Sequence, residues 1–186
     1  MLSVSEPTEA CCLPAFDKLS LRWNIELWIM NITIRFANAN DASQLSMLLH
    51  DIGWFSTIQN ETETETTTRL QTQLASINPE SYTLVVAETD AGQIVGYTAV
   101  HWLPYLILSG AEGYVSELFV TEAARGMGVG RRLLTAVKQE AVQRGCCRLQ
   151  LLNMRNRESY QRRFYEKDGW RERENAANFV YSIEDR

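Results

Sequence analysis

The chain has 186 residues, of which 45% are hydrophobic and 22% charged, and its net charge is −5 at neutral pH. This balance is typical of a soluble domain with its own core and argues against nucleic acid as the main partner. No apolar run has the length of a membrane span, and the start of the chain does not resemble a secretory signal, so we expect no membrane partner. The adjacent cysteine pairs Cys11-Cys12 and Cys146-Cys147 lack zinc or redox spacing, which favours a reduced, cytoplasmic setting.

The composition divides the chain into a leader and a domain. Residues 1–30 are rich in Ser, Glu, Pro and Thr at their start and carry no clear core pattern. Met30 directly precedes the alternating segment Ile32–Phe36, which reads as a first strand. We therefore expect a leader outside the core at 1–30 and one domain at 31–184. Whether residues 1–29 belong to the native protein stays open.

A helix and an aromatic loop follow the first strand. Asp41 is placed to cap a helix that carries Leu45, Leu48 and Leu49 and ends near Gly53. Trp54 and Phe55 come next, in a loop. Two interpretations compete for them: they cover the core, or they shape a pocket for an acceptor molecule.

The next segment alternates glutamate and threonine. Asn60–Thr68 is too polar for a core strand, so we expect a solvated loop leading into a helix through Leu70, Leu74 and Ile77. Its glutamates, Glu61, Glu63 and Glu65, form a solvated face or, alternatively, attract a cationic substrate.

Two strands and a hairpin turn come before the middle of the chain. Tyr82–Glu88 and Ile94–Trp102 are β-branched and aromatic, and the segment T-D-A-G-Q between them is a turn signal. His101 lies near the end of the second strand.

A buried strand then turns through glycines into a helix. Tyr114–Val120 has strand character, and strict alternation places Glu117 on one face with Val115 and Phe119. From Gly128 the spacing is helical, because one apolar stripe holds Val129, Leu133, Leu134 and Val137.

The turn between this strand and helix has the composition of a phosphate site. Arg125, Gly126, Gly128 and Gly130 place unpaired backbone N–H groups at the positive end of a helix dipole. A P-loop is excluded because Arg131 and Arg132, not Lys and Ser or Thr, follow the last glycine, and the even glycine spacing does not fit the dinucleotide fingerprint. A turn that only caps the helix is the simpler alternative.

The remaining elements complete a mixed sheet. The helix ends near Arg144-Gly145, and Arg148–Asn153 is a strand that a right-handed crossover makes parallel to the preceding one. Arg155–Lys167 has helical spacing and stops at Asp168-Gly169. The last two strands are expected at Trp170–Glu174 and Phe179–Ile183.

Two motifs resemble those of a known family. Arg125, Gly128 and Gly130 match R-x-x-G-x-G, and N156-R-E-S-Y-Q-R-R-F-Y-E-K-D-G-W170 is similar to a closing motif N-x-x-A-x-x-F/L-Y-x-x-x-G-F, with one or two extra residues before the tyrosine. From Ile32 to about Ile183 the chain resembles the GNAT superfamily of acetyl-CoA-dependent N-acetyltransferases. The resemblance implies the α/β GNAT fold, a central mixed β-sheet flanked by helices on both faces.

The resemblance also implies acetyl-CoA as co-substrate, and no metal. Its pantetheine arm would pair with the backbone of the central strand where the two parallel strands separate, and its pyrophosphate would lie on the glycine turn. The implied cofactor-binding residues are Leu118, Phe119, Val120, Arg125, Gly126, Met127, Gly128, Val129, Gly130, Arg131 and Asn156.

Catalysis would need a base, an oxyanion donor and a proton donor. Glu117 is the first candidate for the base, with Ser116, Tyr114 and His101 as alternatives. Strand N–H groups supply donors for the carbonyl oxygen. By resemblance, Tyr165 protonates the departing thiolate; its alternative role is packing against the cofactor.

The expected function is transfer of an acetyl group from acetyl-CoA to a primary amine of a small molecule or peptide, by direct attack in a ternary complex. The rival interpretation is a non-catalytic acyl-CoA-binding regulatory module. The identity of the amine stays open, and the family resemblance also admits a homodimer.

Overall fold

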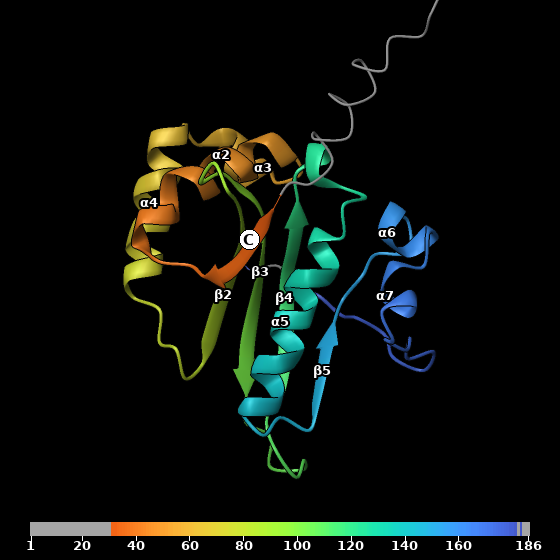
Figure 1. Ribbon diagram of the computed structural model, residues 1–186. Helices are drawn as coiled ribbons and strands as arrows, with labels where there is room; N and C mark the ends of the chain where they lie inside the picture. The colour runs from red at the N-terminus through yellow and green to blue at the C-terminus, as the bar shows by residue number, and fades with distance from the viewer. Residues whose placement is uncertain (1–30, 182, 184–186) are drawn as a thin grey trace, which may run out of the picture. The chain divides into compact units, whose positions relative to one another are not determined.

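The computed structural model describes residues 31–181 and residue 183, so the expected leader lies outside the described residues. A single five-stranded sheet in the order β1-β2-β3-β4-β5 forms the centre of the domain (Figure 1). Neighbouring strands are antiparallel except β4 and β5, which are parallel as the sequence predicts. The strands are β1 Ile32–Phe36, β2 Tyr82–Thr89, β3 Ile94–Leu103, β4 Glu112–Val120 and β5 Arg148–Leu151.

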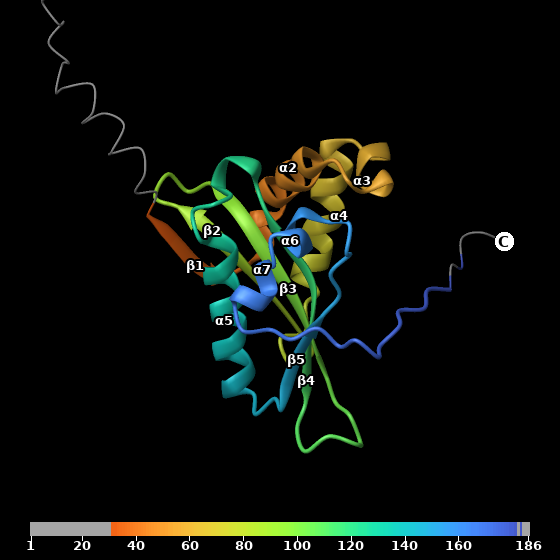
Figure 2. The same ribbon diagram turned by 90° about the vertical axis from the view of Figure 1, so that its right-hand side faces the viewer.

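Helices cover both faces of the sheet. Figure 2 shows α5 on one side of the strands and α2 and α4 on the other. This arrangement confirms the expected mixed α/β architecture. The helical elements are η1 Ala39–Asp41, α2 Ala42–Ile52, α3 Ser56–Asn60, α4 Glu63–Ala75, η2 Glu122–Ala124, α5 Val129–Gln143, α6 Glu158–Gln161 and α7 Phe164–Lys167.

The sheet face under α5, here the α5 face, carries the predicted apolar stripe. Val129, Leu133, Leu134 and Val137 are at most 1% exposed, and three of them, Val129, Leu133 and Val137, pack with strand side chains of this face. Burying residues of this size is the main source of stability for such a layer. The helical spacing read from the sequence is therefore confirmed.

The opposite face, here the α2/α4 face, has a second core. Leu45 and Leu48 of α2 pack on strand residues that include Tyr97 and the side chain of Phe119. As predicted, α2 ends at Gly53, which takes a left-handed conformation (φ 66°).

A β-bulge at Ser116 interrupts the alternation of side chains that the sequence predicts along β4. The register with β3 shifts between Ala99, which lies opposite Glu117, and Val100, which lies opposite Val115. Ser116 is the extra residue, so the side chains on either side of it exchange faces. Val115 packs on the α5 face and Phe119 on the α2/α4 face, so the prediction that Glu117 shares a face with both is wrong for Val115.

Asp41 has a different role from the predicted cap of α2. Its carboxylate makes no cap hydrogen bond to that helix; it accepts hydrogen bonds from Arg35, at 2.8 Å twice, and from the backbone N–H of Asn38, also at 2.8 Å. Arg35 also donates to Glu88 at 2.7 Å. Burial opposes ionisation of Asp41, but the bonds from Arg35 and Asn38 hold its pKa below the ordinary value.

The polar segment before α4 is more ordered than predicted. The helix begins at Glu63, inside the expected loop, because Thr62 and Glu65 form a capping box. Glu61 accepts hydrogen bonds from Arg69 and from the hydroxyl of Thr66. Two of the three glutamates therefore stabilise the helix region itself.

The C-terminal part departs most from the prediction. β5 ends at Leu151, and the expected helix Arg155–Lys167 is split into α6 and α7 by Arg162 and Arg163, the latter at φ 55°. As predicted, the helical segment stops at Asp168-Gly169.

The two expected final strands are absent from the described residues. Trp170–Glu174 and residues 179–181 have no strand partner, and Phe179 and Val180 are 91% and 81% exposed. β-Branched and aromatic composition favours a strand only where a neighbouring strand completes the ladder. Here β5 is the last strand of the sheet.

Candidate functional site

The glycine turn leads from β4 into α5 through two left-handed residues. Gly126 and Gly128 both have φ 79°, and nothing lies within 4 Å of a Cβ placed on either. Gly128 is the N-cap of α5 and makes no side-chain cap bond, so the first N–H groups of the helix lack intrahelical acceptors. This open, positive end of a 15-residue helix fits a pyrophosphate.

The arginines beside the glycine turn differ in the partners that their side chains contact. Arg132 donates to the carbonyl oxygen of Ile32, and Arg131 lies 3.5 Å from a carboxylate oxygen of Asp168. The side chain of Arg131 is 73% exposed, so this weak pair leaves it accessible to an anion. Arg125 and Met127 are exposed in the turn itself.

The start of α5, the end of β4 and α7 converge. A Cβ on Gly130 would lie 3.2 Å from the ring of Phe164 and 3.7 Å from the side chain of Val120. A larger residue at this position would press on the Phe164 ring, which would have to shift by a few tenths of an ångström. The glycine turn is thereby brought close to the helix that carries Tyr165, two features separated by more than thirty positions in the chain.

Tyr165 is held in a largely apolar setting. Its ring centroid lies 5.0 Å from that of Phe164 and 6.2 Å from that of Trp170. Burial raises the pKa of its phenol to about 12. The hydroxyl therefore stays protonated at neutral pH and is able to donate a proton.

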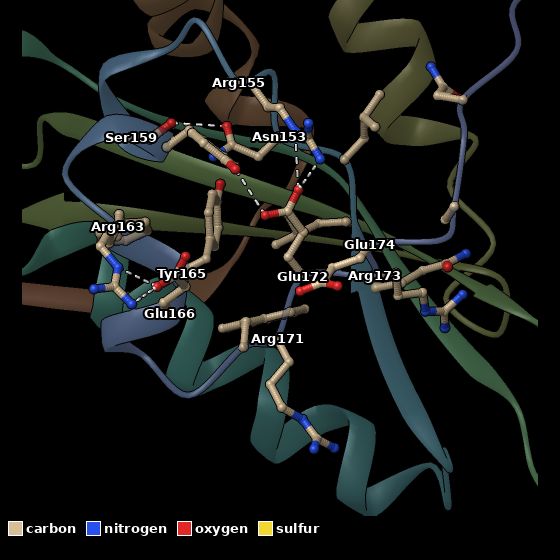
Figure 3. A pocket seen from close by; sticks show the side chains of 18 of the residues that line it. Asn153, Arg155, Ser159, Arg163, Tyr165, Glu166, Arg171, Glu172, Arg173 and Glu174 are labelled. Atoms are coloured by element: carbon tan, nitrogen blue, oxygen red, sulfur yellow. Dashed lines mark hydrogen bonds and ion pairs between the residues drawn. The ribbon is translucent and has the colours of Figure 1, made fainter.

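A cavity of about 690 Å³ lies beside β5, α6 and α7 (Figure 3). Tyr165 and Tyr114 line it, together with four arginines and three glutamates. Two of the arginines are paired with glutamates: Arg155 donates a hydrogen bond to Glu172 at 2.7 Å, and Arg163 donates one to Glu166. The predicted binding residue Asn156 does not line this cavity; it lies exposed in the turn before α6.

Asn153 is a cavity residue that sequence reasoning missed. Its side-chain oxygen accepts a hydrogen bond from Ser159 at 3.0 Å, and it lines the cavity. The long spacing of the closing motif was a signal that its asparagine position was uncertain.

Glu117 lies on the α2/α4 face. Its carboxylate accepts a hydrogen bond of 2.6 Å from the hydroxyl of Tyr97. Burial and the negative charge of Glu117 raise the pKa of Tyr97, so this hydroxyl remains a donor. The structure shows no direct contact between Glu117 and Tyr165.

The three alternative base residues are distributed differently. Tyr114 lines the cavity, whereas the ring of His101 lies against that of Tyr82 at 4.8 Å. Ser116 is exposed at the bulge, with its hydroxyl 3.4 Å from the carbonyl oxygen of Ala99.

The second half of β4 is open on one edge. β5 pairs with residues Glu112–Val115 and ends, while β4 continues to Val120. Leu118 and Val120 direct their side chains to the α5 face and Phe119 to the other. Beyond Val115, the backbone N–H groups on this edge of β4 have no β5 partner.

The sequence profile of the acetyltransferase (GNAT) family matches residues 48–170. The chain belongs to the GNAT acetyltransferase family. The matched range contains the glycine turn, Glu117 and Tyr165.

Individual relatives agree with this assignment. An acetyltransferase of Agrobacterium fabrum is 44% identical over 55 residues, which is 30% of this GNAT chain and 33% of that protein. The match thus spans about one third of the length of that curated relative. The family model and this relative name the same class, acetyltransferase.

Solved structures resemble the fold over most of the domain. A transcriptional regulator from Bacillus halodurans C-125 is 25% identical with a TM-score of 0.67, over 81% of this chain and 100% of that one. A ribosomal-protein-alanine N-acetyltransferase from Brucella melitensis biovar Abortus 2308 is 19% identical with a TM-score of 0.63, over 82% of this chain and 99% of that one. The second similarity shows the GNAT fold alone.

Residues 31–181 and 183 show neither a membrane-spanning helix nor a metal-binding cluster. They contain no helix long and apolar enough to cross a bilayer. They also contain no group of three or more His, Cys, Asp or Glu residues arranged to hold a metal ion.

Proposed function

We propose that the protein transfers an acetyl group from acetyl-CoA to a primary amine of a small molecule or peptide, by direct attack within a ternary complex. The observation that carries this proposal is the convergence at Gly130, where the glycine turn, the open half of β4 and the helix of Tyr165 approach one another. Acetyl-CoA supplies an activated thioester; the chain supplies the groups around it.

The glycine turn would hold the pyrophosphate. The left-handed conformations of Gly126 and Gly128 leave the space above the turn open, and the first N–H groups of α5 point out of the helix end. Arg125 and Arg131 add positive charge at the same place.

The open half of β4 would position the reacting carbonyl. N–H groups of Leu118–Val120 that have no β5 partner are donors for the pantetheine arm and for the carbonyl oxygen. The phenol of Tyr165, with its pKa raised by burial, would donate the proton that the departing sulfur needs.

Glu117 would accept the proton of the amine. Tyr97 fixes its carboxylate on the α2/α4 face, on the same strand that would bind the thioester. Glu117→Gln retains an oxygen that accepts the Tyr97 hydrogen bond but removes the base. We expect kcat/KM to fall about 10- to 100-fold near neutral pH, and less at alkaline pH where more amine is already neutral. An unchanged rate would remove Glu117 from the mechanism.

The decisive experiment measures release of the CoA thiol from acetyl-CoA across a panel of amines, with acetyl-CoA binding followed in the same samples. Release with one class of amine would establish the reaction. Binding without release would favour the non-catalytic acyl-CoA-binding module, and absence of binding would overturn the proposal. The cytoplasmic setting and the homodimer remain predictions.

A further inference from the structure

Four aromatic rings gather on the α2/α4 face near the end of β4. Phe119 is their centre: the ring centroids of Trp54, Phe55 and Tyr97 lie 5.8, 5.5 and 5.7 Å from its own. Trp54 and Phe55 come from the connection between α2 and α3 and are 48% and 39% exposed. They therefore cover Phe119 and still present ring surface to solvent.

One face of Trp54 already holds a cation. The guanidinium carbon of Arg157, from the turn before α6, lies 3.9 Å from the ring centroid of Trp54. Within residues 31–181 this is the shortest of the arginine or lysine contacts to an aromatic ring, and Arg157 has no carboxylate within 4.0 Å. The ring thus binds a positive charge without an acidic partner.

The other end of the aromatic group is negative. Glu117 precedes Phe119 by two residues on the same face, past the bulge, and the Tyr97 hydroxyl binds one of its carboxylate oxygens. The carboxylate of Glu117, the apolar ring of Phe119 and the face of Trp54 that binds a cation therefore lie in this order on the surface. This order of groups is complementary to a molecule with two amino groups joined by an apolar chain.

We propose that the preferred acceptor is an aliphatic diamine, with one nitrogen beside Glu117 and its second, charged nitrogen over Trp54 in place of the Arg157 guanidinium. This inference rests on the proposed acetyl transfer and narrows its substrate class. Arg157 is exposed in the turn before α6 and has no carboxylate partner among residues 31–181, so a ligand cation of the same charge would be able to take its place over the ring. Trp54 and Arg157 then determine specificity and do not take part in the chemistry.

The first test compares unbranched diamines of increasing length with matched monoamines, in which one amino group is replaced by a methyl group of similar size. At the best length we expect kcat/KM for the diamine to exceed that for its monoamine by about tenfold. Equal values at every length would overturn the diamine preference while leaving acetyl transfer established. If no amine of either series is acetylated, the proposed function fails and not only its substrate class.

The second test locates the preference on the aromatic face. Trp54→Leu keeps an apolar side chain but removes the ring, and we expect the ratio of diamine to monoamine kcat/KM to fall to about one. Trp54→Phe, which retains a smaller ring, should give an intermediate ratio, so the test does not depend on one variant folding. A ratio unchanged in both variants would contradict the proposed placement.

Arg157→Gln tests the exchange itself. Removing the competing guanidinium should lower KM for the diamine about threefold and leave the monoamine KM the same. A higher diamine KM in this variant would show that Arg157 belongs to the bound state, against the proposal. Tyr105→Leu is the matched control. Tyr105 lies in the connection between β3 and β4, at the other end of the strands, and its ring is similarly exposed and lies beside Arg148 of β5. This variant should leave the ratio unchanged.

Discussion

The two halves of β4 have different surroundings. Residues Glu112–Val115 have a strand partner on both edges, β3 and β5, whereas Glu117–Val120 pair with β3 alone and Ser116 bulges out between the two halves. In the first half, Glu112 is fully buried and its carboxylate pairs with Arg148. In the second half, side chains are exposed or half-buried; Phe119 is the centre of the four aromatic rings, and Glu117 binds the hydroxyl of one of them, Tyr97.

The difference shows how one strand has two roles: its doubly paired half stabilises the sheet, and its singly paired half is available for binding. A doubly paired segment satisfies its backbone within the sheet and tolerates little change. The singly paired segment keeps backbone donors available, and the bulge at Ser116 turns Glu117 toward the α2/α4 face. The following predictions test this contrast, from the largest expected effect to the smallest.

Gly128→Asp should have the largest effect, on ligand binding at the open end of the strand. A carboxylate at the first turn of α5 repels the pyrophosphate, and we expect acetyl-CoA affinity to fall at least about 100-fold. Calorimetric titration measures it. Gly128→Asn is the matched control, since asparagine has the same shape and tolerates the left-handed backbone. Equal affinities for the two variants would contradict a charge effect and with it the phosphate assignment.

Gly113→Ala tests the doubly paired half. The added Cβ would approach the ring of Trp102 to 2.6 Å and would also meet the side chain of Leu149. We expect the free energy of unfolding to fall by about 2–3 kcal/mol, as for overpacking of a dense core. Urea denaturation measures this loss. A change below about 0.5 kcal/mol would show that this half is packed no more tightly than a surface strand.

Tyr165→Phe tests the chemistry beside the singly paired half. We expect kcat to fall about 10- to 100-fold with acetyl-CoA affinity unchanged, because the ring remains and the proton donor is lost. The raised pKa of about 12 keeps the wild-type phenol neutral, so its ionisation should cause no loss of rate until the pH approaches that value. An unaltered kcat would assign Tyr165 to packing alone.

The same residue links pH to stability. Because burial raises its pKa, neutral Tyr165 stabilises the fold below its ordinary pKa, and this contribution is lost as pH rises through about 12. The alkaline decline in melting temperature should therefore be smaller in Tyr165→Phe than in the wild type. Equal alkaline declines would indicate that the phenol is not buried in solution.

Ser116→Ala should have the smallest effect. Its side chain is exposed and its hydroxyl is only 3.4 Å from its nearest acceptor, so the free energy of unfolding should change by less than about 0.5 kcal/mol. Urea denaturation of Ser116→Ala and Gly113→Ala under the same conditions compares the loss of stability in the two halves of β4. A tenfold loss of kcat in this variant would instead transfer the role of base from Glu117 to Ser116.

Periodicity predicted the parts of this fold that local pattern determines. The stripe of Val129 and Leu133 fixed the buried face of α5, and the turn between β2 and β3 fixed a hairpin. The glycine turn was also readable, because the left-handed backbone at Gly128 (φ 79°) favours glycine over residues with a larger side chain.

Features that depend on distant partners were not readable. An extra residue such as Ser116 cannot be recognised in an alternating pattern. That Val115 faces the opposite side of the sheet from Glu117 is therefore seen only from the pairing of β4 with β3. The segment around Phe179 has the composition of a strand, but a strand forms only with a neighbour. Asp41 looked like a helix cap because its attraction to Arg35 cannot be seen in the spacing alone.

Asp168 joins two helices that the sequence separates. Its side chain is 7% exposed; it accepts a hydrogen bond of 2.6 Å from Lys138 of α5 and one of 3.1 Å from the indole of Trp170, and Arg131 lies 3.5 Å away. The helix that begins at the glycine turn and the helix that carries Tyr165 are thus fastened to one carboxylate. Because these contacts tie the end of α7 to α5, we expect an anion bound at the start of α5 to slow hydrogen exchange in α7 as well, and Asp168→Ala to remove that effect.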